Sequence, residues 1–166
     1  MSLRDRTGER PDPFTRAADG EIAGLERALV PLAHLNAALA ARAKSQAIGV
    51  EIANTTKPAA LAAHLDGLAL IAIGFPGFGD GRGFSLATAM RAAGYRGRLR
   101  AVGPLIADQF AYALACGFDE VEVPDAVAAR QPVAQWLAAL AHMPGGLKVG
   151  ASLLDVRHAA RRGIAP

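Results

Sequence analysis

Short apolar runs alternate with helix-like segments along most of this chain, starting at about residue 46. The short runs predict β-strands, and the segments whose apolar residues recur every three or four positions predict helices. Gly, Pro, Asn or Asp stands at most of the junctions between them. The predicted strands are residues 47–52, 68–74, 99–102 and 118–123, and the predicted helices are residues 58–65, 84–93, 104–116 and 126–142.

Connections this short between strands and helices indicate crossover units, which are right-handed and make the strands parallel. The predicted fold class is therefore α/β, with a small, doubly wound, mainly parallel sheet of about four strands and helices on both faces. A closed eight-stranded barrel needs roughly 200 residues or more, and the chain has 166. An open sheet and a half-barrel that dimerises both stay open as alternatives. Gly94 and Gly117 follow predicted helices and are expected to adopt left-handed backbone there.

The two ends of the chain depart from this α/β pattern. Residues 1–19 are charged and poor in large apolar side chains, so they predict an irregular tail. A single α/β domain is expected over residues 20–145, and it opens with an amphipathic helix over about residues 22–40, bent at Pro31. Residues 146–166 predict a basic tail or a short helix.

The composition is 52% hydrophobic but only 5% aromatic, with one cysteine, Cys116. A single cysteine excludes an internal disulfide and a multi-cysteine metal or iron–sulfur site in this chain, and the histidines lack metal-ligand spacing. We therefore predict no metal site and interpret Cys116 as a small buried apolar residue. The apolar runs, such as residues 68–73, are too short to span a bilayer, and the amino terminus has no apolar signal core. The expected location is cytoplasmic, without membrane contact.

The formal net charge is +3 and the sequence pI is about 9.5, with arginines concentrated in residues 82–100 and 157–162. This distribution favours an anionic partner. Nucleic acid is disfavoured, because neither cluster is interleaved with stacking aromatic residues. Arg98 and Arg100 alternate at the start of a predicted strand and are interpreted as a solvated or protein-facing patch.

The stretch FPGFGDGRGFS, residues 75–85, places four glycines, an acid and a base between a predicted strand and a predicted helix. In a parallel sheet the strand-to-helix loops leave from one edge, where backbone N–H groups at helix starts bind anions. The stretch should therefore lie beside the loop after residues 47–52 and the start of the helix at 104–116. The candidate ligand-binding residues are Lys57, Asp80, Gly81, Arg82, Gly83, Ser85 and Gln109.

Two other interpretations of this stretch stay open. In the first, Asp80 pairs with Arg82 and bonds local backbone, while the glycines supply positive φ angles. In the second, Asp80 or Asp108 is a general acid or base. The glycine spacing fits neither the dinucleotide fingerprint nor the phosphate-binding loop, so no cofactor is encoded by a recognisable motif.

A longer pattern of residues surrounds this stretch, within residues 75–118. Its members are Phe75, Phe78, Asp80, Gly81, Arg82, Gly83, Ser85, Ala87, Arg91, Gly94, Tyr95, Gly97, Leu99, Arg100, Ala101, Val102, Gly103, Asp108, Gln109, Cys116, Gly117 and Phe118. In this pattern the chain resembles an uncharacterised bacterial family, domain of unknown function 934, whose members are described as oxidoreductases involved in sulfite reduction. The resemblance implies a place in assimilatory sulfate and sulfite reduction.

Sulfite reduction to sulfide takes six electrons and needs haem, iron–sulfur or flavin chemistry, for which this chain shows no anchor. The expected function is therefore an accessory or oxidoreductase-like protein that binds a small anionic metabolite or a sulfur-assimilation enzyme at residues 80–83. A small enzyme using Asp80 or Asp108 is one alternative, and a structural subunit or interaction module, including a homodimer, is another. Whether the chain is an enzyme stays open.

Overall fold

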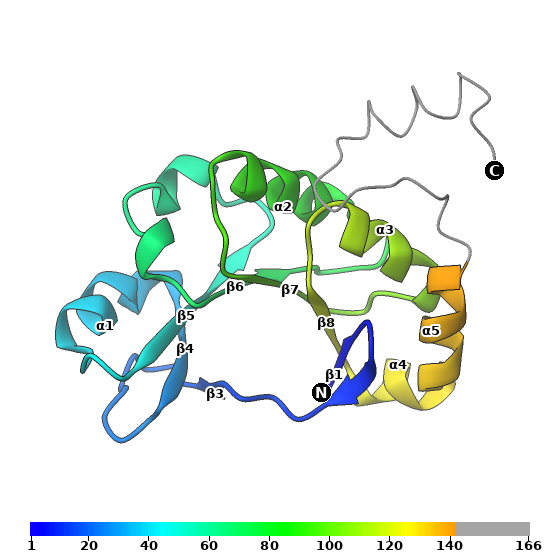
Figure 1. The fold of residues 1–166 in the computed structure, drawn as a ribbon, viewed down its shortest axis with the longest axis horizontal. Helices are drawn as coiled ribbons and strands as arrows, with labels where there is room; N and C mark the ends of the chain where they lie inside the picture. Colours follow the sequence, from blue (N-terminus) through cyan, green and yellow to red (C-terminus); the bar gives the residue numbers. More distant parts are fainter. Residues whose placement is uncertain (142–166) are drawn as a thin grey trace.

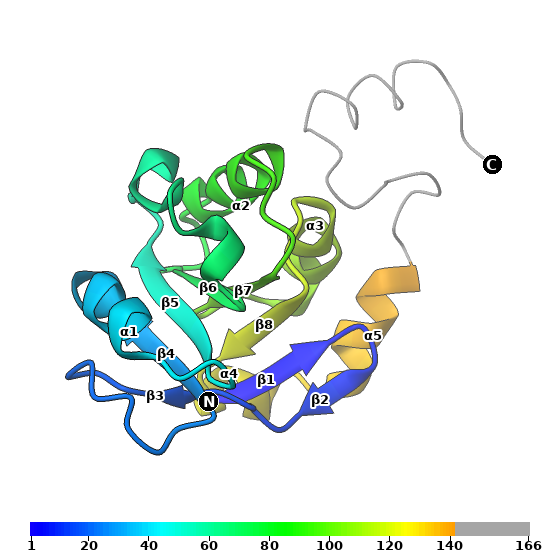
Figure 2. The same cartoon turned by 60° about the vertical axis from the view of Figure 1, so that its left-hand side comes forward.

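One eight-stranded sheet organises the protein (Figure 1), whose computed structural model describes residues 1–141. Figure 2 shows the hairpin of the first two strands lying beside the last strand of the chain. In sheet order the strands are β2 (Gly8–Arg10), β1 (Ser2–Asp5), β8 (Glu120–Val123), β7 (Arg98–Val102), β6 (Leu70–Gly74), β5 (Ala47–Ala53), β4 (Arg27–Pro31) and β3 (Thr15–Arg16).

Strands β3 to β8 are parallel and follow one another across the sheet in chain order, whereas β1 and β2 are antiparallel additions beside β8. The sheet curls like an incomplete barrel, and the helices lie outside the curl (Figure 1). The α-helices are α1 (Leu35–Ala41), α2 (Arg82–Ala92), α3 (Phe110–Ala115), α4 (Asp125–Arg130) and α5 (Val133–Ala141), and the 3-10 helices are η1 (Leu32–His34), η2 (Pro58–Leu61), η3 (Leu65–Gly67) and η4 (Ala107–Gln109).

The α/β class is confirmed, but the prediction of about four doubly wound strands is wrong. Right-handed crossovers that always step in the same direction place every helix on one face of the sheet. A doubly wound sheet needs a point at which the strand order reverses. Strands β3 to β8 have no such reversal, so the opposite face of the sheet turns toward the inside of the curl.

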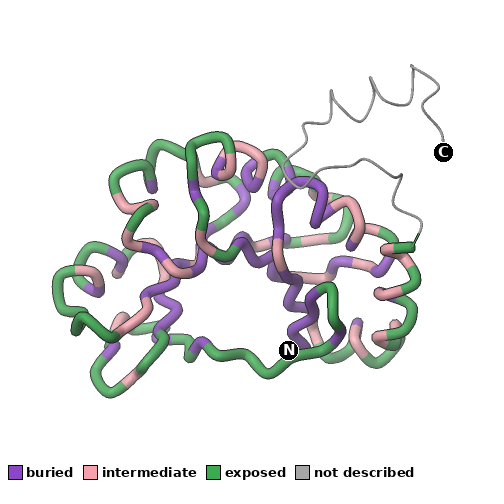
Figure 3. The backbone as a smooth tube through the Cα atoms, in the orientation of Figure 1, coloured by how far each residue is buried: buried purple, intermediate pink, exposed green. Residues whose placement is uncertain are grey.

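The curled sheet is buried on both faces. Along β6, Ile71 and Ile73 belong to the large core under the helices. Leu70 and Ala72 alternate with them and so face the inside of the curl, in a smaller apolar cluster that includes Phe14. Figure 3 shows this concentration of buried residues along the strands.

Residues 1–19 are not an irregular tail, because they contain β1, β2 and the two-residue strand β3. On the helix side of β1, the buried Arg4 guanidinium donates a hydrogen bond to the Gln131 carbonyl at 2.8 Å and lies 5.0 Å from the centre of the Trp136 ring. Hydropathy alone misses such a strand, because specific polar contacts bury it. Residues 11–14 then cross the open side of the curl to reach β3 (Figure 1).

The predicted helix over residues 22–40 is wrong in its first half, where β4 lies. The α-helix begins only at Leu35, after the 3-10 turn η1. Residues 28–30 are all buried, as expected for a parallel strand covered on both faces. In a chain rich in Ala and Leu, such a run is hard to distinguish from a buried helix segment.

The four predicted strands are confirmed as β5 to β8, and the helix over residues 84–93 is confirmed as α2. The other three predicted helices are shorter and broken. Residues 58–65 form two 3-10 turns, η2 and η3, and residues 104–116 form η4 and α3. The helix predicted from residue 126 divides into α4 and α5 around Pro132, which lacks the N–H that a continuous helix needs.

Two local predictions are confirmed. Gly94 and Gly117 lie just past α2 and α3 with φ angles of +96° and +107°. Cys116 is buried, and this burial raises the pKa of its thiol, as expected for an inert apolar residue. The end of the helix predicted to reach residue 142 and the predicted tail at residues 146–166 lie outside the described residues. None of the helices within residues 1–141 has the length and apolar character to cross a membrane.

Candidate functional site

Residues 75–83, which we call the glycine loop, leave the carboxyl end of β6 and lead into α2. Aromatic packing fixes both ends of the loop. The Phe75 ring is buried, with the centroids of Phe84 and Phe118 at 4.9 and 5.9 Å. Gly83 lies against this ring so closely that a Cβ there would be 2.3 Å from the ring Cζ. The fold alone therefore accounts for glycine at position 83.

Asp80 and Arg82 form an ion pair within the glycine loop. Asp80 Oδ1 accepts hydrogen bonds from the Arg82 backbone N at 3.2 Å and from Nε at 2.9 Å, and Oδ2 accepts one from Nη2. The hydrogen bonds from Arg82, and then the proximity of Asn54, hold the pKa of Asp80 well below its usual range. A carboxylate with so low a pKa is a weak base. The Asp80 carboxylate thus occupies the position at the start of α2 where an external anion was expected to bind. This conformation corresponds to the interpretation in which Asp80 pairs locally with Arg82.

Gly77 and Gly79 have no evident role in shaping the loop. Neither has a positive φ, so the expectation that loop glycines supply positive φ angles is wrong. A Cβ at either position would meet no atom within 4 Å. Gly81 has a φ of −77°, and a Cβ there would make only an ordinary contact. Positions that could carry a side chain are thus glycine, which leaves the backbone exposed and conformationally free.

Phe78 lies between these glycines and is 63% exposed. Among the large hydrophobic residues of the described chain, only Met1 is also exposed. Gln109 Nε2 donates a hydrogen bond to the Phe78 carbonyl at 2.7 Å, so the loop is tied to the end of η4. The expectation that Gln109 lies beside the glycine loop is confirmed, while its ligand-binding role stays a prediction.

Asn54 follows β5, in the loop that the sequence places at this edge, but it is not among the candidate ligand-binding residues predicted from the sequence. Its side chain is 7% exposed, and Nδ2 has no hydrogen-bond partner of ordinary geometry within the described residues. The amide nevertheless lies close enough to Asp80 to help lower the pKa of that carboxyl. A buried donor without a partner costs about 1–3 kcal/mol. A loop conformation that gave Nδ2 an acceptor would recover part of this cost.

The remaining candidates are exposed on the elements around the loop. Lys57 precedes η2, Ser85 lies in the first turns of α2, and Asp108 lies in η4. They share the carboxyl edge with the glycine loop, but within residues 1–141 none of their side chains makes a hydrogen bond or ion pair to it. The structure therefore brings these residues to one edge without joining them into one site.

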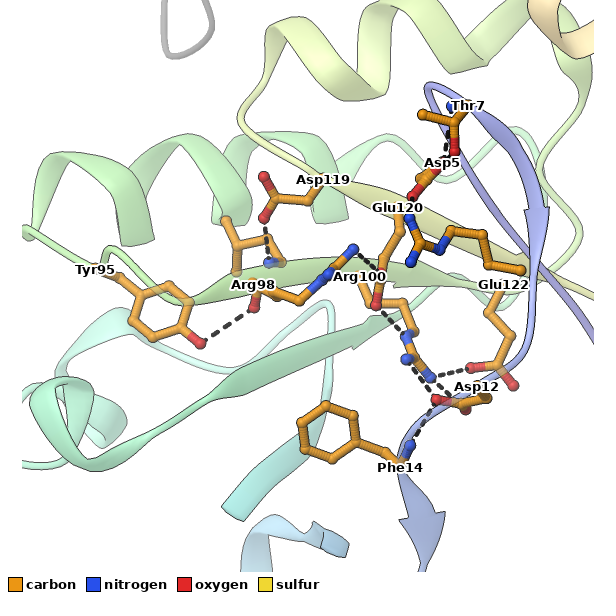
Figure 4. A network of polar contacts seen from close by, with 12 residues as sticks. Asp5, Thr7, Asp12, Phe14, Tyr95, Arg98, Arg100, Asp119, Glu120 and Glu122 are labelled. Carbon is orange, nitrogen blue, oxygen red and sulfur yellow. Dashed lines mark hydrogen bonds and ion pairs between the residues drawn. The ribbon is translucent and has the colours of Figure 1, made fainter. Parts of the chain in front are cut away.

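A second polar cluster, not predicted from the sequence, fills the inside of the curl (Figure 4). Arg100 in β7 is fully buried and donates hydrogen bonds to Asp12 at 2.7 and 2.8 Å, to Glu120 at 2.8 Å and to Glu122 at 2.9 Å. Burial acts to lower the pKa of Arg100, but the hydrogen bond to Asp12 and the charge of Glu120 outweigh it and raise the pKa. The prediction of a solvated or protein-facing patch is therefore wrong for Arg100.

The cluster continues to both sides of Arg100. Arg16 donates to both Glu122 carboxylate oxygens at 2.8 and 2.9 Å, and its Nε donates to Glu51 at 3.0 Å. On the other side, Arg98 pairs with Glu120 at 2.6 Å. We call this set the inner charge network; its members are Asp12, Arg16, Glu51, Arg98, Arg100, Glu120 and Glu122.

Within the part of the chain that the structure describes, no group of three or more His, Cys, Asp or Glu residues could hold a metal ion. The glycine loop offers an exposed aromatic ring and an exposed guanidinium.

Residues 49–144 match the model of a family described as a bacterial protein of unknown function. The matched segment is more than half of the chain and contains the glycine loop, most of β5 and all of β6, β7 and β8. No curated protein matches the chain.

Proposed function

This chain belongs to the bacterial family designated domain of unknown function 934, and we propose that it is an accessory protein of assimilatory sulfate and sulfite reduction that docks a sulfur-assimilation enzyme through its glycine loop. The sulfur context rests on the resemblance given under Sequence analysis, which implies a place in sulfite reduction; the family match itself describes a bacterial protein of unknown function. The docking surface rests chiefly on Phe78, which is 63% exposed in a loop whose central glycines the fold does not require.

The chemistry of the loop suits a protein partner. Aromatic residues and arginine are enriched at the centres of interfaces, where they supply much of the binding energy. Phe78 offers the aromatic ring, and the Arg82 side chain, 60% exposed, offers a guanidinium that Asp80 already orients. The free glycines let the backbone adapt to a partner, and the unpartnered Asn54 amide favours such a rearrangement.

Binding of a small anion at residues 80–83 is the weaker form of the proposal. The Asp80 carboxylate already accepts the Arg82 backbone N–H and the guanidinium. A sulfate or sulfite ion would have to displace this carboxylate and would be repelled by its charge. A protein partner can use the exposed ring without breaking the ion pair.

The geometry also weighs against direct catalysis by Asp80. An efficient general base has a pKa near the working pH, whereas hydrogen bonds from Arg82 lower the pKa of Asp80. Asp108 is exposed on η4, and within residues 1–141 its carboxylate makes no hydrogen bond or ion pair that would couple it to Asp80. An accessory role is therefore favoured over a small enzyme.

Growth on defined sulfur sources tests this proposal. In a host that carries the gene, deletion should slow growth on sulfate, and sulfide should restore it. The wild-type gene and Phe78→Leu, which keeps an apolar side chain, should complement the deletion on sulfate. Phe78→Ser should fail to complement, because serine removes the apolar contact area.

Ala129→Ser, on the exposed face of α4, is the matched control and should complement fully. Immunoblots check that all variants accumulate equally. Full growth of the Phe78→Ser strain would contradict docking through this ring, and a deletion strain that sulfide does not rescue would contradict the assignment to sulfur assimilation.

A further inference from the structure

A cavity of about 470 Å³ opens at the carboxyl ends of β4, β5 and β6, and no residue of the glycine loop lines it. Its wall is mainly apolar, and the apolar residues include Leu29, Pro31 and Ala53. Arg16 and Glu51 provide the charged part of the wall. The volume lies within the range of roughly 300–1,000 Å³ typical of sites for small organic molecules.

The inner charge network gives the surroundings of this cavity a net negative charge. Three guanidinium groups face four carboxylates in one connected set of ion pairs within the described residues, which leaves one negative charge in excess. The guanidinium groups are those of Arg16, Arg98 and Arg100, and the carboxylates are those of Asp12, Glu51, Glu120 and Glu122.

The excess charge is most accessible at Glu51. Glu120 and Glu122 are 2% exposed, and the buried Arg100 contacts both. The Glu51 side chain is 38% exposed and has a single ion-pair partner, the Nε of Arg16. Its second oxygen, Oε1, makes no hydrogen bond within residues 1–141 and is free to accept one.

From this arrangement we propose that the cavity binds a small organic cation, a primary amine carried on an apolar body. The ammonium group donates to Glu51 Oε1, and the apolar body lies against Leu29, Pro31 and Ala53. A charge-assisted hydrogen bond at the edge of an apolar cavity is stronger than one in open water. An anion of the same shape is disfavoured, because the network already carries an excess negative charge, and three of the five N–H groups of Arg16 are paired with Glu51 and Glu122.

Three ligands of similar shape separate the contribution of the ammonium charge from that of the apolar body. Phenethylamine, 2-phenylethanol and 3-phenylpropionate are titrated into the full chain, and the backbone amide signals are followed by two-dimensional NMR. Phenethylamine should give saturable shifts at Leu29, Ile52 and Gly74, which line the cavity. The alcohol should bind at least about tenfold more weakly, since one charge-assisted hydrogen bond is worth that factor, and the acid should not bind there.

Glu51→Gln should weaken phenethylamine binding by about tenfold or more and leave the alcohol unchanged. The half-exposed pair with Arg16 contributes little to folding, so this variant should fold. Ala18→Leu, at an exposed position of the cavity wall, should fill the cavity and abolish binding of both. The matched controls are Glu21→Gln and Ala129→Leu, both at exposed positions outside the wall.

Equal affinity for phenethylamine in Glu51→Gln and the wild-type chain would overturn the proposal. So would 3-phenylpropionate binding as tightly as the amine, or amine shifts confined to residues outside the cavity wall. A loss of binding in Ala18→Leu, with Ala129→Leu unchanged, would support the cavity as the site.

Discussion

At the residue scale, two glycines of the same loop differ in whether the fold has room for a side chain at their position. Gly83 lies against the ring of Phe75, and that ring is itself held between two other aromatic side chains. Gly79 has open space where a Cβ would stand and no positive φ. Packing therefore explains the glycine at position 83, whereas neither packing nor backbone conformation in this fold requires glycine at position 79.

Alanine at the two positions should therefore change stability in opposite directions. Gly83→Ala should lower the free energy of unfolding by about 1–3 kcal/mol, because the new methyl group overpacks a fixed ring. Gly79→Ala should raise it by about 0.4–1 kcal/mol through a less flexible unfolded chain. Urea unfolding of both variants and the wild type measures these differences. Equal stability of the two alanine variants would contradict the packing role of Gly83.

The residues of the glycine loop could be predicted from the sequence, and those of the inner charge network could not. Asp80 and Arg82 are close in the chain, so their pairing is a local matter. Arg100 and Glu122 lie on different strands, and each alternates with apolar residues as a half-exposed strand would. Their burial depends on the curl of the sheet, which no local pattern contains.

At the element scale, residues 11–16 form a strap that closes the inside of the curl. Phe14, 6% exposed, covers the inner apolar cluster. Asp12 holds the strap to β7 through two hydrogen bonds with Arg100. The sequence predicts a tail here because the strap is held by one buried ring and one carboxylate. The strands β5 to β8, in contrast, are apolar runs that a sequence pattern reveals.

Asp12→Asn should lower the free energy of unfolding by about 1–3 kcal/mol near pH 7, because it removes a charged partner of a fully buried guanidinium. Burial acts to raise the pKa of Asp12, but the hydrogen bond from Arg100 outweighs it and lowers the pKa. The unfolded value is about 3.9, so the stability from Asp12 is present above that pH and is lost as the pH falls through the folded pKa.

The difference between wild type and Asp12→Asn should accordingly shrink below about pH 4. Urea unfolding at pH 7 and at pH 3 measures it. Asp19→Asn, at an exposed turn, is the control and should have little effect at either pH. An Asp12→Asn chain as stable as the wild type at pH 7 would show that the strap does not depend on this ion pair.

At the scale of the whole molecule, the order of strands decides where a site can form. The sequence predicted parallel strands joined by helices, and it left open whether they form an open sheet or a half-barrel. Successive strands that always step the same way produce the curl, with helices outside and charged residues inside. The carboxyl edge, where the loop was predicted, then carries both the exposed Phe78 and the mouth of the cavity.

The central claim, docking of a sulfur-assimilation enzyme through the glycine loop, is tested most directly by photocrosslinking in cells growing on sulfate. A photoreactive phenylalanine derivative is placed at position 78 and, as a control, at position 129 on the exposed face of α4. The account predicts that position 78 captures a sulfur-assimilation enzyme, identified by mass spectrometry, that position 129 does not capture. Products from position 78 that match those from position 129, or that contain no enzyme of sulfur assimilation, would contradict it.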